Sequence, residues 1–186
     1  MNQRTLELFH MEIARQCNFA LFAEADLRQY LQQLTPPPNF TDSDIRAILS
    51  QGAVLIDRFW YSAHALLSAT ANISKILWPS NQSTRSQEDA RQIRAGLGID
   101  DTSPLKNRRM RDHFEHFDER IERFAQSDVN YVDTGIGHRL VHSDPPAVHM
   151  RNFDPEENSI TFQNETLLLG PTMEAIHNTY GEDPDP

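Results

Sequence analysis

The first part of the chain has the hydrophobic spacing of an amphipathic helix. From about Arg4 to Leu34, apolar side chains recur every three or four residues, with one longer step, which places them on one helical face. These positions are Leu6, Phe9, Ile13, Cys17, Ala20, Leu27, Tyr30, Leu31 and Leu34. The prolines at 36–38 end the pattern, because proline lacks the backbone donor and clashes with the preceding turn. We therefore expect a first long helix over residues 4–34.

A second, longer helix is predicted from about Ser43 to Leu77. Hydroxyl and acidic residues at 41–44 can cap its first turn, and Pro79 follows its end. Its seam alternates steps of four and three residues: Ile45, Leu49, Gly52, Ile56, Phe59, Ala63, Leu66, Thr70, Ile73 and Leu77. Such a heptad-like spacing suits antiparallel packing at a shallow angle in a bundle.

Two more helices are predicted before Ser127. A short one runs from Ser86 to Ala95 and is closed by glycines. The other covers 105–124, where Ser103 can cap and Pro104 takes the first helical position. The apolar stripe of this helix consists of Met110, Phe114, Phe117, Ile121 and Phe124.

The character of the sequence changes after Ser127. Residues 133–146 are rich in Gly, Asp, Pro and His and indicate a long loop. Three short apolar segments at 147–153, 159–163 and 166–169 predict strands that form a β-hairpin, and 172–180 predicts a last helix. The final residues are acidic and indicate a disordered tail.

These elements predict a mainly α protein. We expect an up-and-down helical bundle of about four helices in residues 1–128 and a small C-terminal appendage in 129–186, holding the loop, the β-hairpin, the short helix and the acidic tail. Because the strongest core patterns precede Ser127, the appendage is expected to be dispensable for folding the bundle.

The predicted helix at 105–124 carries the candidate chemistry. On an ideal helix, polar side chains line one flank of its apolar stripe: Arg109, His113, His116 and Arg120. Asp112 precedes His116 by one turn, where its carboxylate can orient the imidazole. A salt-bridged surface is the plainer alternative, since Arg108–Asp112 and Arg111–Glu115 are ordinary stabilising pairs.

The segment from Arg111 through Asp112 to His116 has an arginine, a polar residue, three further residues and a histidine. It resembles the signature of the HEPN superfamily, the helical nucleotide-binding domains of higher eukaryotes and prokaryotes. The resemblance implies a helical fold and, as in many members, a metal-independent ribonuclease. Arg111 and His116 would then be the active pair and Asp112 the polar orienter. Asp112 departs from the asparagine most often found there, and Glu115, Asp118 and Glu119 make the surroundings acidic.

The resemblance also implies a homodimer, in which two copies of the 105–124 helix meet and form one composite cleft. His116 would act as base or acid, and Arg111 would hold the phosphate. Further contacts to substrate are expected from Arg108, Arg109, His113 and Arg120. On an ideal helix Arg111 and His116 diverge by about 140°, whereas Arg109 lies on nearly the same face as His116. Which arginine faces the cleft stays open.

Composition limits the alternatives. The formal net charge of −10 argues against a general nucleic-acid coat protein, so any RNA contact must be local. The single cysteine, Cys17, excludes an internal disulfide and a cysteine-based zinc site. His138 and His142 lie in a Gly- and Pro-flanked stretch and are interpreted as solvated loop residues. We therefore expect neither a metal nor a cofactor.

Three functions remain. The first is a HEPN-like endoribonuclease or an RNA- or nucleotide-binding protein. The second is a protein with the same chemistry that serves as the toxin of a toxin–antitoxin pair and has an antitoxin as its partner. The alternative is a non-catalytic dimerisation or interaction protein whose acidic tail contacts a basic partner. The first residues lack the apolar core of a signal peptide, and no apolar run is long enough to span a bilayer, so a cytoplasmic location without membrane partners is expected.

Overall fold

The computed structural model describes residues 1–35, 39, 41–80, 83–127, 130–137, 147–163 and 165–181. The candidate loop histidines His138 and His142 and the acidic tail at 182–186 lie outside the described residues. So does the side chain of Arg111, whose backbone is described.

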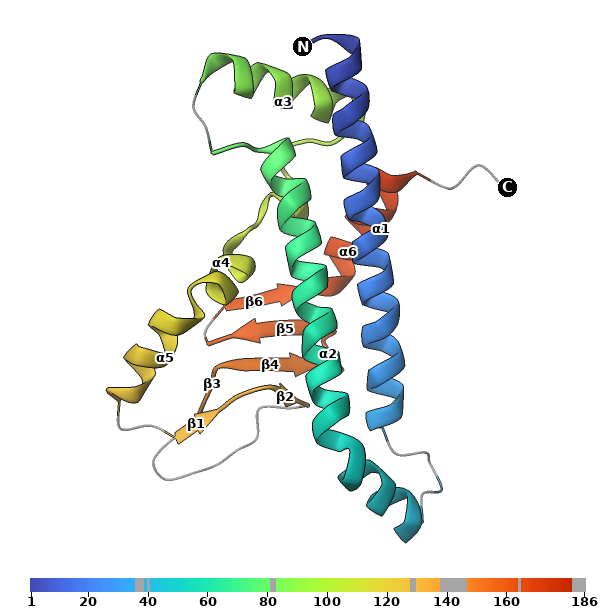
Figure 1. Ribbon diagram of the computed structural model, residues 1–186, viewed down its shortest axis with the longest axis vertical. Helices are drawn as coiled ribbons and strands as arrows, with labels where there is room; N and C mark the ends of the chain where they lie inside the picture. Colours follow the sequence, from blue (N-terminus) through green and yellow to red (C-terminus); the bar gives the residue numbers. More distant parts are fainter. Residues whose placement is uncertain are drawn as a thin grey trace.

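Two long helices form the largest part of the molecule. Helix α1 spans Gln3–Leu34 and α2 spans Asp42–Leu77, and they run antiparallel, side by side (Figure 1). The side chain of Asn2 caps α1 by accepting a hydrogen bond from the backbone N–H of Thr5 at 2.8 Å. The predicted helices 4–34 and 43–77 are confirmed, because their hydrophobic periods and their flanking caps and prolines agree.

Shorter elements follow at the C-terminal end of α2. Helix α3, Thr84–Gly96, begins at the capping hydroxyl of Ser83. It is followed by the 3₁₀ turn η1 at Pro104–Lys106 and by helices α4, Arg109–Glu115, and α5, Phe117–Ala125.

The expectation of one continuous helix over 105–124 is wrong. The chain is extended at Asn107 between η1 and α4, and His116 forms a joint between α4 and α5 with φ −103° and ψ 35°. Phe114 and Phe117, on the two sides of the joint, both contact the ring of Phe162 in the sheet, with centroids 5.5 and 6.2 Å away. We infer that packing of both rings onto one strand outweighs the helical preference of this segment.

The C-terminal part forms a small mixed sheet and a helix. Four strands lie in the order β2-β4-β5-β6, with β2 parallel to β4 and the remaining pairs antiparallel. Their bounds are Gly135–Ile136, Arg151–Asp154, Ser159–Phe162 and Glu165–Leu168. A separate parallel pair joins β1, Asn130–Val132, to β3, Ala147–His149. Helix α6, Leu169–Tyr180, follows β6 directly. The predicted hairpin is therefore present, but β2 falls within the segment predicted as loop.

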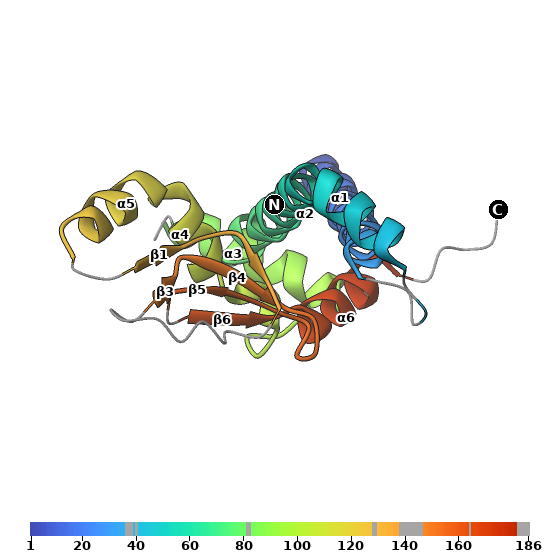
Figure 2. The same cartoon turned by 90° about the horizontal axis from the view of Figure 1, so that it is seen from below.

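The molecule has two layers. In Figure 2 the α1–α2 pair lies on one side, and the sheet and α6 lie on the other. A single hydrophobic cluster joins the layers, with Phe59 and Leu66 of α2, Phe162 of β5 and Ile176 of α6 all fully buried in it. The fold is thus mainly helical with a small C-terminal mixed sheet and a short helix. An up-and-down bundle of four helices is not confirmed, since among the described helices only α1 and α2 pair along their length (Figure 1).

The expected boundary between residues 128 and 129 does not divide this core. Met150, Phe153 and Ile160, all beyond it, are buried in the same cluster as the α1 and α2 side chains. The aromatic ring of Phe153 lies 4.9 Å from that of Phe59. The sheet therefore covers part of the surface that the long helices bury.

Candidate functional site

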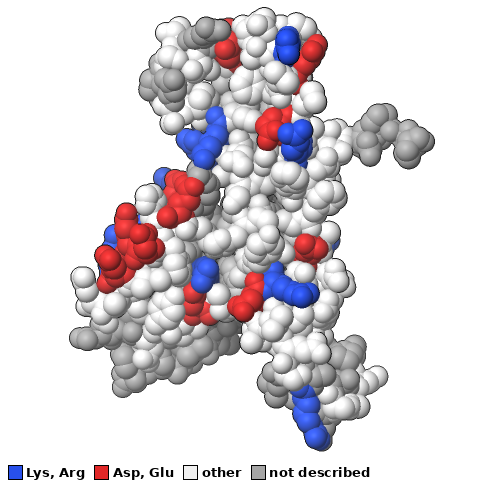
Figure 3. Space-filling view, viewed as in Figure 1, with Lys and Arg blue, Asp and Glu red and all other residues white. Residues whose placement is uncertain are grey.

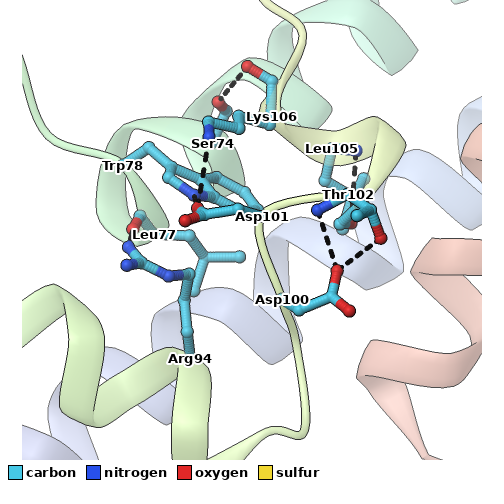
Figure 4. A network of polar contacts seen from close by, with 10 residues as sticks. Ser74, Leu77, Trp78, Arg94, Asp100, Asp101, Thr102, Leu105 and Lys106 are labelled. Atoms are coloured by element: carbon cyan, nitrogen blue, oxygen red, sulfur yellow. Dashed lines mark hydrogen bonds and ion pairs between the residues drawn. The ribbon is translucent and has the colours of Figure 1, made fainter.

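A polar network anchors the segment that leads into α4 (Figure 4). The indole N–H of Trp78 donates to Asp101 at 2.6 Å, and the ammonium of Lys106 lies 3.2 Å from the same carboxylate. These contacts hold the pKa of Asp101 below its usual range. The carbonyl of Lys106 accepts from the hydroxyl of Ser74, and the guanidinium of Arg94 lies over the Trp78 ring. The network fastens η1 to the ends of α2 and α3, and so fixes where α4 begins.

Three of the four predicted arginines, Arg108, Arg109 and Arg111, lie at the N-terminal end of α4. The side-chain amide oxygen of Asn107 accepts a hydrogen bond from the backbone N–H of Arg109 at 3.0 Å, which satisfies one donor at the start of α4. Arg108 is half-buried at the N-cap position, whereas Arg109 is exposed in the first turn. Asp112 is exposed one turn later. On α4, Arg109 is therefore a described arginine that is exposed and can reach a ligand at the surface.

His113 is packed against the sheet. Its ring stacks on Phe162 with centroids 4.9 Å apart and planes 7° from parallel. A carboxylate oxygen of Glu165 lies 3.6 Å from Nε2, and the side chain is only 13% exposed. Neither ring nitrogen has a hydrogen-bond partner among the described residues. This histidine faces the protein interior, away from the exposed surface that His116 occupies.

His116 stands at the joint between α4 and α5. Its backbone N–H donates to the carbonyl of Asp112 at 3.1 Å, and its own carbonyl accepts from the backbone N–H of Arg120 at 3.3 Å. The side chain is 57% exposed, and Nδ1 lies 3.3 Å from a carboxylate oxygen of Glu119. The carboxylate placed beside the imidazole is thus that of Glu119, one turn after it in α5. Sequence reasoning proposed Asp112 for this role, because it assumed an unbroken helix.

Arg120 is half-buried on α5. Its Nε atom is removed from solvent and has no acceptor among the described residues. The structure therefore separates the four side chains predicted on one flank: Arg109 and His116 are exposed, while His113 and Arg120 are turned toward the protein.

A buried ion pair that sequence reasoning missed supports the joint from the side of the sheet. The guanidinium of Arg151 in β4 binds Asp133 through two hydrogen bonds, from Nε at 2.8 Å and from Nη2 at 2.5 Å. The hydroxyl of Tyr131 donates to the same carboxylate at 2.9 Å. The guanidinium also lies 4.6 Å from the centroid of the Phe117 ring, the first residue of α5. Because His116 immediately precedes Phe117, this contact positions the exposed imidazole.

Burial and the contacts within this cluster shift the pKa values of Asp133 and Tyr131 in opposite directions. Burial raises the pKa of Asp133, but hydrogen bonds from Arg151 and Tyr131 and the charge of Arg151 outweigh that effect, so the pKa lies below its usual range. Burial and then the hydrogen bond to Asp133 raise the pKa of Tyr131 to about 12. Near neutral pH the cluster therefore consists of a carboxylate, a guanidinium and a neutral phenol. No local motif marks it, since its two charged members are 18 residues apart.

His64 of α2 packs against Phe114 of α4. Its ring meets that of Phe114 edge to face at 4.1 Å, and its Nε2 has no hydrogen-bond partner among the described residues. Burial, followed by the positive charge of Arg151, lowers the pKa of this imidazole below its usual value. A small cavity of about 110 Å³ opens beside it, lined in part by Ser68 and Glu115. His64 is thus a neutral packing residue near pH 7.

The Arg151–Asp133 pair gives the first prediction. The substitution Asp133→Asn is expected to lower the free energy of unfolding by about 3–5 kcal/mol, because it leaves a mostly buried guanidinium without a counter-charge. Chemical denaturation with circular dichroism detection measures this loss. The matched control is Asp57→Asn, which changes an exposed carboxylate on α2 and should stay within about 0.5 kcal/mol of the wild type.

The double variant Asp133→Asn/Arg151→Met separates charge from packing. Removing both charges should recover much of the loss, because no unpaired charge remains in the protein interior. A double variant as unstable as Asp133→Asn alone would show that packing of the Arg151 stem onto Phe117, and not the ion pair, supports the joint.

Within the described ranges, no group of three or more His, Cys, Asp or Glu side chains is placed so that it could hold a metal ion. No helix among the described residues is both long and apolar enough to cross a membrane.

Comparisons with known proteins do not assign the chain to a family. No family model matches its sequence, and no curated protein and no solved structure resembles it closely enough to be counted as a relative.

Proposed function

We propose that this chain is a HEPN-like, metal-independent endoribonuclease in which His116 is the acid–base group. The observation that carries the proposal is the position of His116. It is an exposed imidazole at a helix joint, held by the backbone of two helices and 3.3 Å from the carboxylate of Glu119. It is also the final residue of the arginine–histidine motif that resembles the HEPN signature.

The proposed reaction needs few groups from the protein. RNA supplies its own nucleophile, the 2′-hydroxyl, which attacks the adjacent phosphorus while the bond to the 5′-oxygen breaks. His116 takes the proton from the 2′-oxygen while water protonates the departing 5′-oxygen or, in its protonated form, His116 gives a proton to the 5′-oxygen while water takes the one from the 2′-oxygen. A guanidinium stabilises the negative charge on the phosphorane oxygens, and Arg111 or Arg109 fills this role. One product then ends in a 2′,3′-cyclic phosphate and the other in a 5′-hydroxyl.

Dimerisation through the 105–124 segment would complete the site. No residue of α5 is fully buried, although the helix carries an apolar stripe. Phe117 and Phe124 are half-buried, and Ile121 is 43% exposed. A second copy of α5 against this stripe would cover these side chains and bring a second His116 and its arginines to the same cleft. If the protein is a toxin, an antitoxin would bind the same surface.

The alternative function, a non-catalytic interaction protein, is favoured by one observation. Acidic side chains are concentrated over α4 and α5 in Figure 3. On α5 these include Asp118, Glu119 and Glu122, all exposed, in a chain with a formal net charge of −10. Such a surface repels RNA and attracts a basic partner.

Incubation of the purified protein with structured and unstructured RNAs tests the proposal against this alternative. The nuclease is expected to cleave in the presence of EDTA and to leave 2′,3′-cyclic phosphate ends, which mass spectrometry of the fragments identifies. If every RNA stays intact while sedimentation shows a stable dimer, the interaction function replaces the proposed one.

A further inference from the structure

The outer face of the α1–α2 pair, which faces the viewer in Figures 1 and 3, is unusually apolar. Six of the nine large hydrophobic side chains that are exposed in the described part of the chain lie on these two helices. Four of them fall within a sector of about 80° on α1, at an ideal 100° per residue. They are Leu8, Met11, Phe19 and Phe22, with exposed fractions of 57%, 60%, 48% and 67%. The middle of this face is almost free of charged side chains in Figure 3.

A groove of about 400 Å³ runs along this face between the two helices. Phe19 and Phe22 line it on α1, and Tyr61, which is 76% exposed, lines it on α2. The side chains that line it on α2 include small ones, among them Ala65 and Ser68, which leave room in the groove. The groove is thus wide enough to receive aromatic side chains from outside the chain.

The sequence of α1 across the groove is self-complementary. Arg15 precedes Phe19 by four residues, Phe22 follows three residues later, and Asp26 follows after four more. When two such helices cross antiparallel about a two-fold axis between residues 20 and 21, Phe19 lies opposite Phe22 of the other copy. Arg15 then lies opposite Asp26 at both ends of the contact. All four residues are exposed on α1.

The available apolar area is also of the right size. A buried aromatic side chain removes about 150–250 Å² from water, so the exposed parts of Phe19, Phe22 and Tyr61 offer on the order of 400 Å². That is about half of the ~800 Å² per partner that a stable interface buries. Leu8, Met11 and the alkyl parts of the charged side chains supply more.

We propose that this face is an isologous interface, in which a second copy of the chain lays its α1 antiparallel across the groove. Each copy inserts Phe19 and Phe22 beside the other's α1, and two Arg15–Asp26 pairs close the ends. A partner helix of unrelated sequence is not expected to present a charge opposite to Arg15 and Asp26 at each end, with two aromatic rings between them. The contact is separate from the α5 stripe, so a chain that uses both interfaces assembles beyond a dimer.

Sedimentation of charge variants tests this arrangement. The single variants Arg15→Asp and Asp26→Arg should each weaken association roughly tenfold, because two exposed pairs per dimer change from attraction to repulsion. The double variant Arg15→Asp/Asp26→Arg restores opposite charges and should recover association. All three are made in an Ile121→Glu background, which removes the α5 stripe from the measurement.

The double variant is the decisive control. The substitution Arg15→Asp places a second carboxylate beside Glu12, which pairs with Arg15 at 2.9 Å in the wild type, and this local change persists in the double variant. Recovery therefore shows an effect across the interface. A double variant that associates no better than the singles overturns the proposal, as does an Ile121→Glu protein that sediments only as a monomer.

Disulfide trapping checks the antiparallel register. In the proposed dimer the two copies of residue 22 lie about 4.5 Å apart along the helix axis, whereas those of residue 8 are about 37 Å apart. Under mild oxidation Phe22→Cys should therefore form a covalent dimer and Leu8→Cys should not. The native Cys17 is fully buried and stays unreactive in both variants. Equal trapping at both positions would indicate a parallel contact and exclude this register.

Discussion

A chain that ends at Ser127 is expected to lose the cooperative fold of the full-length protein. This expectation replaces the one drawn from the sequence, in which residues 129–186 were dispensable. The hydrophobic cluster is continuous between the long helices and the C-terminal part. Truncation would expose the faces of α1 and α2 that the sheet and α6 now cover.

The size of the effect follows from the side chains removed. Buried members of the cluster beyond Ser127 are Met150, Phe153, Ile160, Phe162, Leu169, Met173 and Ile176. Each contributes about 1.5–3 kcal/mol by burial. Their sum, about 10–21 kcal/mol, is at least as large as the ~5–15 kcal/mol of net stability that most domains have. The truncated chain also no longer loses the conformational entropy of ordering the residues after Ser127. However, Phe59 and its neighbours on α2 become exposed to water, and no entropy gain offsets their exposure.

Thermal unfolding followed by circular dichroism measures the outcome. The chain 1–127 should show no cooperative transition and should bind a dye for exposed apolar surface, while a chain ending at Gly181 should melt like the full-length protein. A sharp transition and native helicity in 1–127 would contradict the expectation and would establish the helical part as an independent domain.

The long helices could be predicted from the sequence because their signals are local and agree with one another. In α1 and α2 the hydrophobic period, the caps and the prolines all point to the same bounds. The strand segments at 159–162 and 165–168 were likewise found from short apolar runs between polar turns. These elements are defined by residues close in sequence.

The joint at His116 could not be predicted, because its cause lies far away in the chain. The segment contains neither proline nor glycine, the residues that usually break a helix. The rings of Phe114 and Phe117 pack against the ring of Phe162, which lies more than 40 residues later in the sequence. The short parallel strands β1 and β2 were missed for a similar reason, since two or three residues carry no period of their own.

The candidate site was therefore only partly foreseen. Placing His113 and His116 on one flank assumed a straight helix, and the joint turns the first toward β5 and leaves the second exposed. The partner of His116 changed for the same reason, from Asp112 to Glu119. The Arg151–Asp133 pair had no local signal at all, because the fold alone brings the two residues together.

His116→Ala is expected to reduce RNA cleavage by about 10²–10⁴-fold, the usual contribution of a general acid–base group. The fold should be unaffected, because the side chain is 57% exposed and its loss opens no cavity in the core. The matched control is His177→Ala, which removes an exposed imidazole from α6 on the other side of the molecule. That variant should cleave like the wild type, and circular dichroism should show equal helicity in all three proteins.

Companion substitutions assign the remaining roles in the same assay. Glu119→Gln should reduce cleavage less than His116→Ala does, since it removes only the carboxylate that lies 3.3 Å from Nδ1 and orients the ring. Comparing Arg109→Ala with Arg111→Ala identifies the guanidinium that stabilises the phosphorane: the variant that loses about as much activity as His116→Ala marks it. Equal cleavage by His116→Ala and the wild type would point to a contaminating nuclease and remove His116 from the mechanism.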